Sequence, residues 1–231
     1  MIGDKEVSSI YLGDKRVTKV YKGTELIYSY EPPTLKLTID SGSDGKFILP
    51  IRNGTTNNLS IDWGDGTSQT YTATPTNYDG VSHTYTNANK QYVISISGRS
   101  VFDGTINSGN GGMLGFGFLS GSTGYNVAAN KEKLLKVEGR LNSLLKKEDL
   151  TPIDLSTIDK SYLYSFTFYR CTKLTSIPNN LFEGISGPAA SLMFYCTFQE
   201  CTSLKDIPAN LFGGISGNAA FNMFDSTFAG C

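Results

Sequence analysis

Residues 168–190 read FYRCTKLTSIPNNLFEGISGPAA, and residues 198–220 read FQECTSLKDIPANLFGGISGNAA. The two stretches align without insertion or deletion at a spacing of 30 residues, and a third copy opens with FAGC at residues 228–231. A fixed period of about 20 to 50 residues is typical of a solenoid, in which each unit buries its apolar face against its neighbours. The repeat therefore predicts a stack of similar units in the last third of the chain.

One copy of the repeat predicts a strand followed by a helix. Leu174 and Ile177 flank a short extended stretch, which Pro178 ends because proline cannot donate to a strand ladder. Placed side by side, these stretches predict a narrow parallel sheet. The apolar residues between Ala189 and Gln199 recur at roughly helical spacing, so we expect a helix that backs the sheet.

Two columns of the repeat keep the same residue type in every copy, one aromatic and one of cysteine. No histidine lies near the cysteines and they form no tight pair, so a metal site is not predicted. Thiols in such columns are small apolar groups, and we expect them in the core. The columns are Phe168, Phe198 and Phe228, and Cys171, Cys201 and Cys231, with Cys196 as the fourth cysteine.

The unit TFxxCTxLxxIPxNLFxGIxG resembles the BspA-like leucine-rich repeats of bacterial and phage surface proteins, in a 30-residue variant that covers residues 166–231. The resemblance implies recognition of an extracellular partner rather than catalysis. Between the conserved leucine and isoleucine, the first copy has Thr175 and Ser176 and the second has Lys205 and Asp206. Because these positions vary while the core columns do not, we expect them to form the recognition face.

Residues 1–31 contain a shorter repeat, IGDKEVSSIY, LGDKRVTKVY and KGTELIYSY, with a glycine at every tenth position. Glycine turns between β-branched and aromatic runs predict a three-rung β-meander. About 30 residues cannot support a core alone. The module is therefore either an anchor that assembles into a homo-oligomer or larger particle, or a hairpin that docks on the next domain. It looks like short repeats near the N-termini of phage structural proteins.

Residues 34–99 predict a small β-sandwich, because short apolar runs alternate with glycine, asparagine and aspartate turns. Its motifs DWGDGT (62–67), HTY (83–85) and YVISISG (92–98) resemble a PKD-type, immunoglobulin-like domain. The resemblance implies that Trp63 packs inside the sandwich and that Gly64 and Gly66 make a tight turn. The strands are expected at 35–40, 47–51, 59–67, 82–86 and 92–98.

The same domain holds the residues that would carry chemistry, if any do. Asp62 and Asp65 could act as a carboxylate pair or bind calcium, and His83 is the only histidine. However, Asp65 lies between turn glycines, and the ligand spacing of a calcium loop is missing. We expect Asp65 to cap the turn and His83 to bond within its own turn region. No catalytic residue, cofactor or metal is predicted.

Residues 100–130 form a glycine-rich connector without the lysine that a phosphate loop requires. The solenoid is expected over 131–231. Its first part, residues 130–160, is either helical or a degenerate first repeat in which Leu144 precedes Leu174 by 30 residues. Because no polar cap follows Cys231, we expect the native chain to continue.

Composition narrows the function classes. Twenty basic and 21 acidic residues give no basic surface for nucleic acid. No apolar run is long enough to insert into a membrane, and no signal sequence follows Met1. The chain is thus expected to be multidomain and mainly β, with an α/β leucine-rich-repeat solenoid. Its expected role is a non-enzymatic phage virion fibre protein that binds virion proteins through its N-terminus and a host protein or polysaccharide through its repeat. The alternative is a bacterial surface or secreted adhesin, and an enzyme ranks third.

Overall fold

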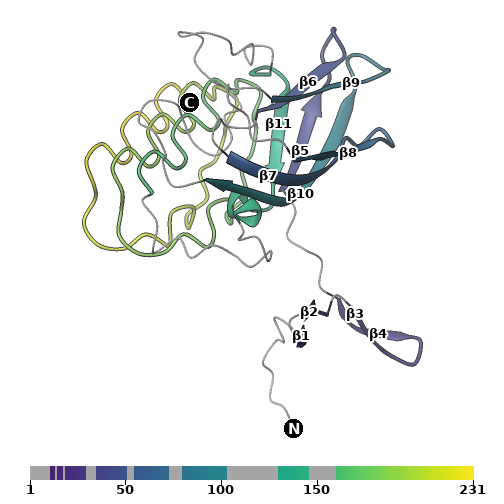
Figure 1. Ribbon diagram of the computed structural model, residues 1–231. Helices are drawn as coiled ribbons and strands as arrows, with labels where there is room; N and C mark the ends of the chain where they lie inside the picture. Colours follow the sequence, from purple (N-terminus) through teal and green to yellow (C-terminus); the bar gives the residue numbers. More distant parts are fainter. Residues whose placement is uncertain are drawn as a thin grey trace. The chain divides into compact units, whose positions relative to one another are not determined.

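The fold is mainly β, as the sequence predicts. Within the described residues the single helix is the short 3-10 helix η2 (Leu141–Leu144). The chain divides into two compact units, residues 1–33 and residues 34–231 (Figure 1). The computed structural model describes residues 11–13, 15–17, 19–29, 35–50, 55–72, 80–102, 130–145 and 160–231.

The first unit consists of two short antiparallel hairpins. In each hairpin the turn glycine has the left-handed backbone that a tight turn requires, with φ of 62° at Gly13 and 65° at Gly23. These turns lie where the ten-residue repeat predicts them, and the first expected rung lies outside the described residues. The hairpins pair β1 (Tyr11–Leu12) with β2 (Lys15–Arg16), and β3 (Lys19–Lys22) with β4 (Glu25–Ser29).

The second unit begins with a five-stranded antiparallel sheet in the order β11-β5-β10-β7-β8 and a two-stranded sheet that pairs β6 with β9 (Figure 1). The larger sheet contains β5 (Leu35–Asp40), β7 (Thr55–Asp62), β8 (Ser68–Tyr71), β10 (Gln91–Phe102) and β11 (Leu134–Glu138). The smaller contains β6 (Lys46–Pro50) and β9 (Gly80–Thr84).

Alternation along the strands builds one core from both sheets. In β5 every second residue is buried, whereas Lys36 between them is exposed. The indole of Trp63 is 1% exposed and belongs to the same cluster, as the sequence predicts. The strands contribute Leu35, Leu37 and Ile39 from β5, Phe47 and Leu49 from β6, and Ile94 and Ile96 from β10.

Residues 130–138 complete this sheet region. β11 pairs antiparallel with β5, so the helix considered for this part of the chain is wrong over Leu134–Glu138. Just before it, the Asn130 side chain bonds both the N–H and the C=O of Ile48 in β6. The buried Lys133 ammonium donates to Asp44 Oδ1 at 2.5 Å and to the carbonyl of Lys46 at 2.6 Å. These bonds fasten the start of β11 to β6.

Residues 160–231 contain turns and isolated bridges but no helix and no strand. The helix expected between Ala189 and Gln199 is wrong, because Leu192 and Cys196 have φ of 57° and 54°, which a right-handed helix excludes. The parallel sheet expected at 174–177 is also wrong, since Ser176 makes only a single bridge, to Lys136. The regular segments are instead three turn ribbons, named here ribbon 1 (160–171), ribbon 2 (190–201) and ribbon 3 (220–231).

Hydrogen bonds join each ribbon to the next in one direction. Even-numbered residues donate forward: the N–H of Phe166 binds the carbonyl of Tyr195 at 2.9 Å, and that of Phe168 binds Thr197 at 2.8 Å. Odd-numbered residues donate three residues back within their own ribbon, as Thr167 does. Successive copies of the repeat therefore lie side by side, with donors on one side of each ribbon and acceptors on the other.

Side chains repeat the same register between the ribbons. Phe168, Phe198 and Phe228 stack in a column with 5.2 Å between successive ring centroids. The Cys201 thiol donates to the carbonyl of Phe168 at 3.1 Å, and the Thr197 hydroxyl donates to the carbonyl of Tyr164 at 2.8 Å. The predicted internal stack is thus confirmed, although no strand or helix supports it.

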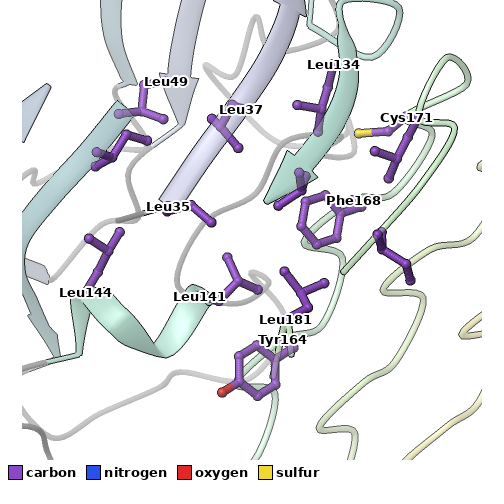
Figure 2. Close-up of a cluster of buried hydrophobic side chains, with 14 of the residues drawn as sticks. Leu35, Leu37, Leu49, Leu134, Leu141, Leu144, Tyr164, Phe168, Cys171 and Leu181 are labelled. Atoms are coloured by element: carbon purple, nitrogen blue, oxygen red, sulfur yellow. The ribbon is translucent and has the colours of Figure 1, made fainter. Parts of the chain in front are cut away.

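The sheet and the first copy share one buried cluster, in which leucines of β5, β11 and η2 lie beside Tyr164, Phe168 and Leu181 (Figure 2). Backbone bonds fix the register: Thr175 N–H donates to Leu135 and Leu141 N–H donates to Leu181, each across 40 residues of sequence. The expected 30-residue alignment of Leu144 with Leu174 is therefore wrong, and β11 with η2 covers the first copy in a different register.

Candidate recognition surface

The four predicted recognition residues are all exposed, but they belong to two different environments. Thr175 donates both its N–H, at 3.0 Å, and its hydroxyl, at 3.1 Å, to the carbonyl of Leu135 in β11. Ser176 bridges Lys136 of the same strand. In the second copy, Lys205 and Asp206 lie on the surface. The first pair therefore helps join the repeat to the sheet, and the second pair has no such structural duty among the described contacts.

A groove lies between the loops that follow the two prolines of the repeat. It has a volume of about 350 Å³ and is open to solvent. Amide, carboxylate and glycine backbone groups dominate its exposed lining, with apolar side chains at its base. The sequence interpretation did not include these loops. The residues that form it include Asn179, Asn180, Glu183, Asn210, Gly213 and Gly214.

Glycine sets the close approach of the two loops. A Cβ on Gly214 would lie 1.9 Å from the carbonyl oxygen of Ile185, so any larger residue must push the copies apart. Beside it, Glu183 forms an ion pair with Arg140 at 3.4 Å. The groove thus combines a fixed backbone with hydrogen-bonding amides, a composition suited to a polar, uncharged ligand such as a sugar.

A second polar cluster lies in the sheet region, around Trp63. His83 Nε2 lies 2.8 Å from Asp65 Oδ2, and the imidazole stacks on the indole with ring centroids 4.6 Å apart. The Tyr85 hydroxyl donates to the carbonyl of Trp63 at 3.1 Å. The expected bond of His83 within its own turn is wrong, because its partner is on the distant DWGDGT turn.

Asp65 is held in its ionised form by this cluster. Burial raises its pKa, but hydrogen bonds from Thr67 and His83 outweigh burial and lower the pKa to about 2. Its Oδ1 accepts the N–H of Thr67 at 3.0 Å, so the predicted turn-capping role is confirmed. Gly64 and Gly66 have φ of 78° and 91°, as the tight turn requires. The cluster fastens the turn to β9.

The cysteines act as core groups in the first two copies. Cys171, Cys196 and Cys201 are buried free thiols, as predicted, whereas Cys231 is a free thiol exposed to solvent. Burial raises the pKa of Cys201 to about 12, so this thiol is protonated at neutral pH. A protonated thiol can donate its inter-copy bond and is a poor nucleophile.

No group of three or more histidine, cysteine, aspartate or glutamate side chains that could hold a metal ion occurs in the described ranges. Among the helices in the part of the chain that the structure describes, none is long and apolar enough to span a bilayer. The glycine-rich residues 103–129, and with them most of the predicted connector, lie outside the described residues.

Comparison with known proteins returned no relative: no protein-family model, no curated protein and no solved structure matches this chain.

Proposed function

We propose that the chain is a non-enzymatic phage virion structural protein, a head or tail fibre, that attaches by its N-terminal module and presents its repeat for adhesion to a host surface. In this proposal the two sheets form a PKD-type sandwich that spaces the repeat from the particle, and the stacked copies form a short leucine-rich-repeat solenoid. The bacterial adhesin remains the alternative, since it would use the same outer modules.

The groove between the two copies is the observation that carries the adhesive role. It combines a repeated scaffold with exposed positions that differ from copy to copy, such as Lys205 and Asp206 in place of Thr175 and Ser176. A buried ladder that holds variable surface groups is how repeat proteins build binding surfaces. The amide lining favours a polysaccharide as the ligand.

The attachment role is supported by apolar groups that the small N-terminal unit leaves exposed. Leu12 is 80% exposed, and Tyr21 and Ile27 are each 55% exposed. A unit of this size has little core of its own, and exposed apolar side chains of this kind favour a protein partner. We propose other virion proteins, or further copies of this chain, as that partner.

Adhesion is tested by binding of the full chain to an array of bacterial surface polysaccharides. We expect binding to at least one glycan, and we expect Asn180→Ala and Asn210→Ala each to weaken it by at least about fivefold, the scale of one lost hydrogen bond. The matched control is Asn218→Ala, because Asn218 is exposed but does not line the groove. Binding that is absent, or equal in all variants, would contradict the adhesive role.

Attachment is tested by light scattering on the full chain and on a chain that lacks residues 1–31. An oligomer that becomes a monomer on truncation supports an assembly module. Detection of the protein in purified phage particles by mass spectrometry supports the virion over the cell-surface adhesin.

A further inference from the structure

The stack of ribbons is polar, and its two ends differ. The forward-donating N–H groups of ribbon 1 bind carbonyls of ribbon 2, and those of ribbon 2 bind carbonyls of ribbon 3 at 2.8 to 3.1 Å. The donors of ribbon 2 are Leu192, Phe194, Cys196, Phe198 and Glu200, and their acceptors are Phe221, Met223, Asp225, Thr227 and Ala229.

Ribbon 3 presents the same row of donors on its free side. Its N–H groups at the equivalent positions bind no acceptor within the described residues, whereas its odd-numbered N–H groups bind within the ribbon. The row has the spacing of the row that ribbon 2 presents to ribbon 3. Its members are Asn222, Phe224, Ser226, Phe228 and Gly230.

The aromatic side chains on this side are also incompletely covered. Phe224 stacks on Phe194 at 5.4 Å and is itself 43% exposed, whereas Phe194 is 0% exposed. Phe221 is 72% exposed. Ribbon 3 thus presents unpaired backbone donors together with half-covered rings.

We propose that the free side of ribbon 3, residues 220–231, is a docking surface for one further ribbon of this same repeat, which binds through its acceptor side. The neighbouring copies define the occupant, because ribbon 3 itself covers the identical row of ribbon 2. Main-chain hydrogen bonds supply affinity and the ring columns fix the register, as in strand addition to an open sheet edge.

A second copy of this chain does not fit the surface. Two free sides placed face to face would oppose donors with donors. Head-to-tail contact would need the opposite side of ribbon 1, but Tyr164 and Phe168 there are at most 1% exposed, and Tyr164 donates its hydroxyl to Asn142 of η2. The occupant is therefore a ribbon whose acceptor side is uncovered. The inference does not depend on the adhesive role.

The test compares the chain as it stands with a chain extended at its C-terminus by a duplicate of residues 202–231. Amide exchange at Phe224, Ser226 and Phe228 is followed by NMR. In the unextended chain we expect these amides to exchange faster than Phe194, Cys196 and Phe198. In the extended chain we expect them to slow by at least about tenfold, as amides do when a cooperative element covers them.

A scrambled 30-residue extension of the same composition is the control and is expected to give no protection. A second extension, duplicated from residues 172–201, guards against one unit that fails to fold. The proposal is overturned if neither duplicate protects the three amides or if the scrambled extension protects them equally. It is also overturned if they are already protected in the unextended chain, whether as a monomer or as a dimer detected by light scattering.

Discussion

At the residue scale, the ribbons depend on left-handed backbone at residues that rarely adopt it. Positive φ recurs every four residues along a ribbon and every 30 between ribbons, at Tyr162, Leu192 and Asn222, for example. For residues other than glycine this conformation costs roughly 1–2 kcal/mol, so the inter-copy bonds must offset it. The cost is local and can be relieved one residue at a time.

We therefore predict that Ser226→Gly raises the free energy of unfolding by roughly 0.5–1 kcal/mol, since Ser226 has φ of 55°. The control is Ala229→Gly, three residues along the same exposed ribbon, where φ is not positive. There glycine adds only unfolded-state entropy, and stability should fall by roughly 0.5–1 kcal/mol. Urea unfolding measures both, and equal losses in the two variants would argue against the ribbon conformation.

Asp65 gives a second prediction at this scale, in acid. Because its folded pKa of about 2 lies below the ordinary value of 3.8, the carboxylate stabilises the fold above about pH 4. That contribution is lost as pH falls from about 4 to about 2. Asp65→Asn should lower stability at pH 7 by roughly 1–2 kcal/mol and should reduce the further loss in acid. Urea unfolding from pH 7 to pH 2 tests this, and pH profiles of the two proteins that run parallel would refute it.

At the scale of elements, the phenylalanine column predicts a graded response. Phe198 is fully buried between two stacked rings, whereas Phe228 has one stacked neighbour and is partly exposed. Phe198→Ala should lower the free energy of unfolding by roughly 3–5 kcal/mol, the usual loss for a buried phenylalanine. Phe228→Ala should lower it by clearly less. Equal losses in urea unfolding would mean that the two rings are equally enclosed.

The elements also separate what the sequence can predict from what it cannot. β5 at Leu35–Asp40 was predicted with its bounds, because apolar and polar residues alternate there. Trp63 and its glycine turn followed from a short motif whose chemistry is local. By contrast, β8 at Ser68–Tyr71 is polar, and the residues of β11 suit a helix as well as a strand until β5 pairs with them.

The ribbons were missed for a related reason. The period of 30 residues correctly predicted which residues stack, but it does not reveal the backbone within a copy. Left-handed φ at Tyr162 or Cys196 has no signal in those residue types; only Asn222 and Gly230 are of the usual kind. At the candidate site, the groove formed by Asn180 and Asn210 arises from two loops meeting across copies, which no single stretch indicates.

At the scale of the molecule, the second unit is a sheet region on which a row of copies grows in one direction. β11 and η2 cover the first copy, and each ribbon then serves as the template for the next. This polarity leaves one end of the row covered and the other available. The proposed adhesive surface and the proposed docking surface both follow from the same 30-residue register.

That register is the central claim, and proton–proton contacts between phenylalanine rings test it most directly. In a sample with NMR-visible phenylalanines, we predict ring contacts between Phe168 and Phe198 and between Phe198 and Phe228, whose centroids lie 5.2 Å apart. Assignment through Phe198→Leu should remove both sets of signals together. Contacts at another spacing, or no contact between these rings in the folded protein, would contradict the stacked arrangement.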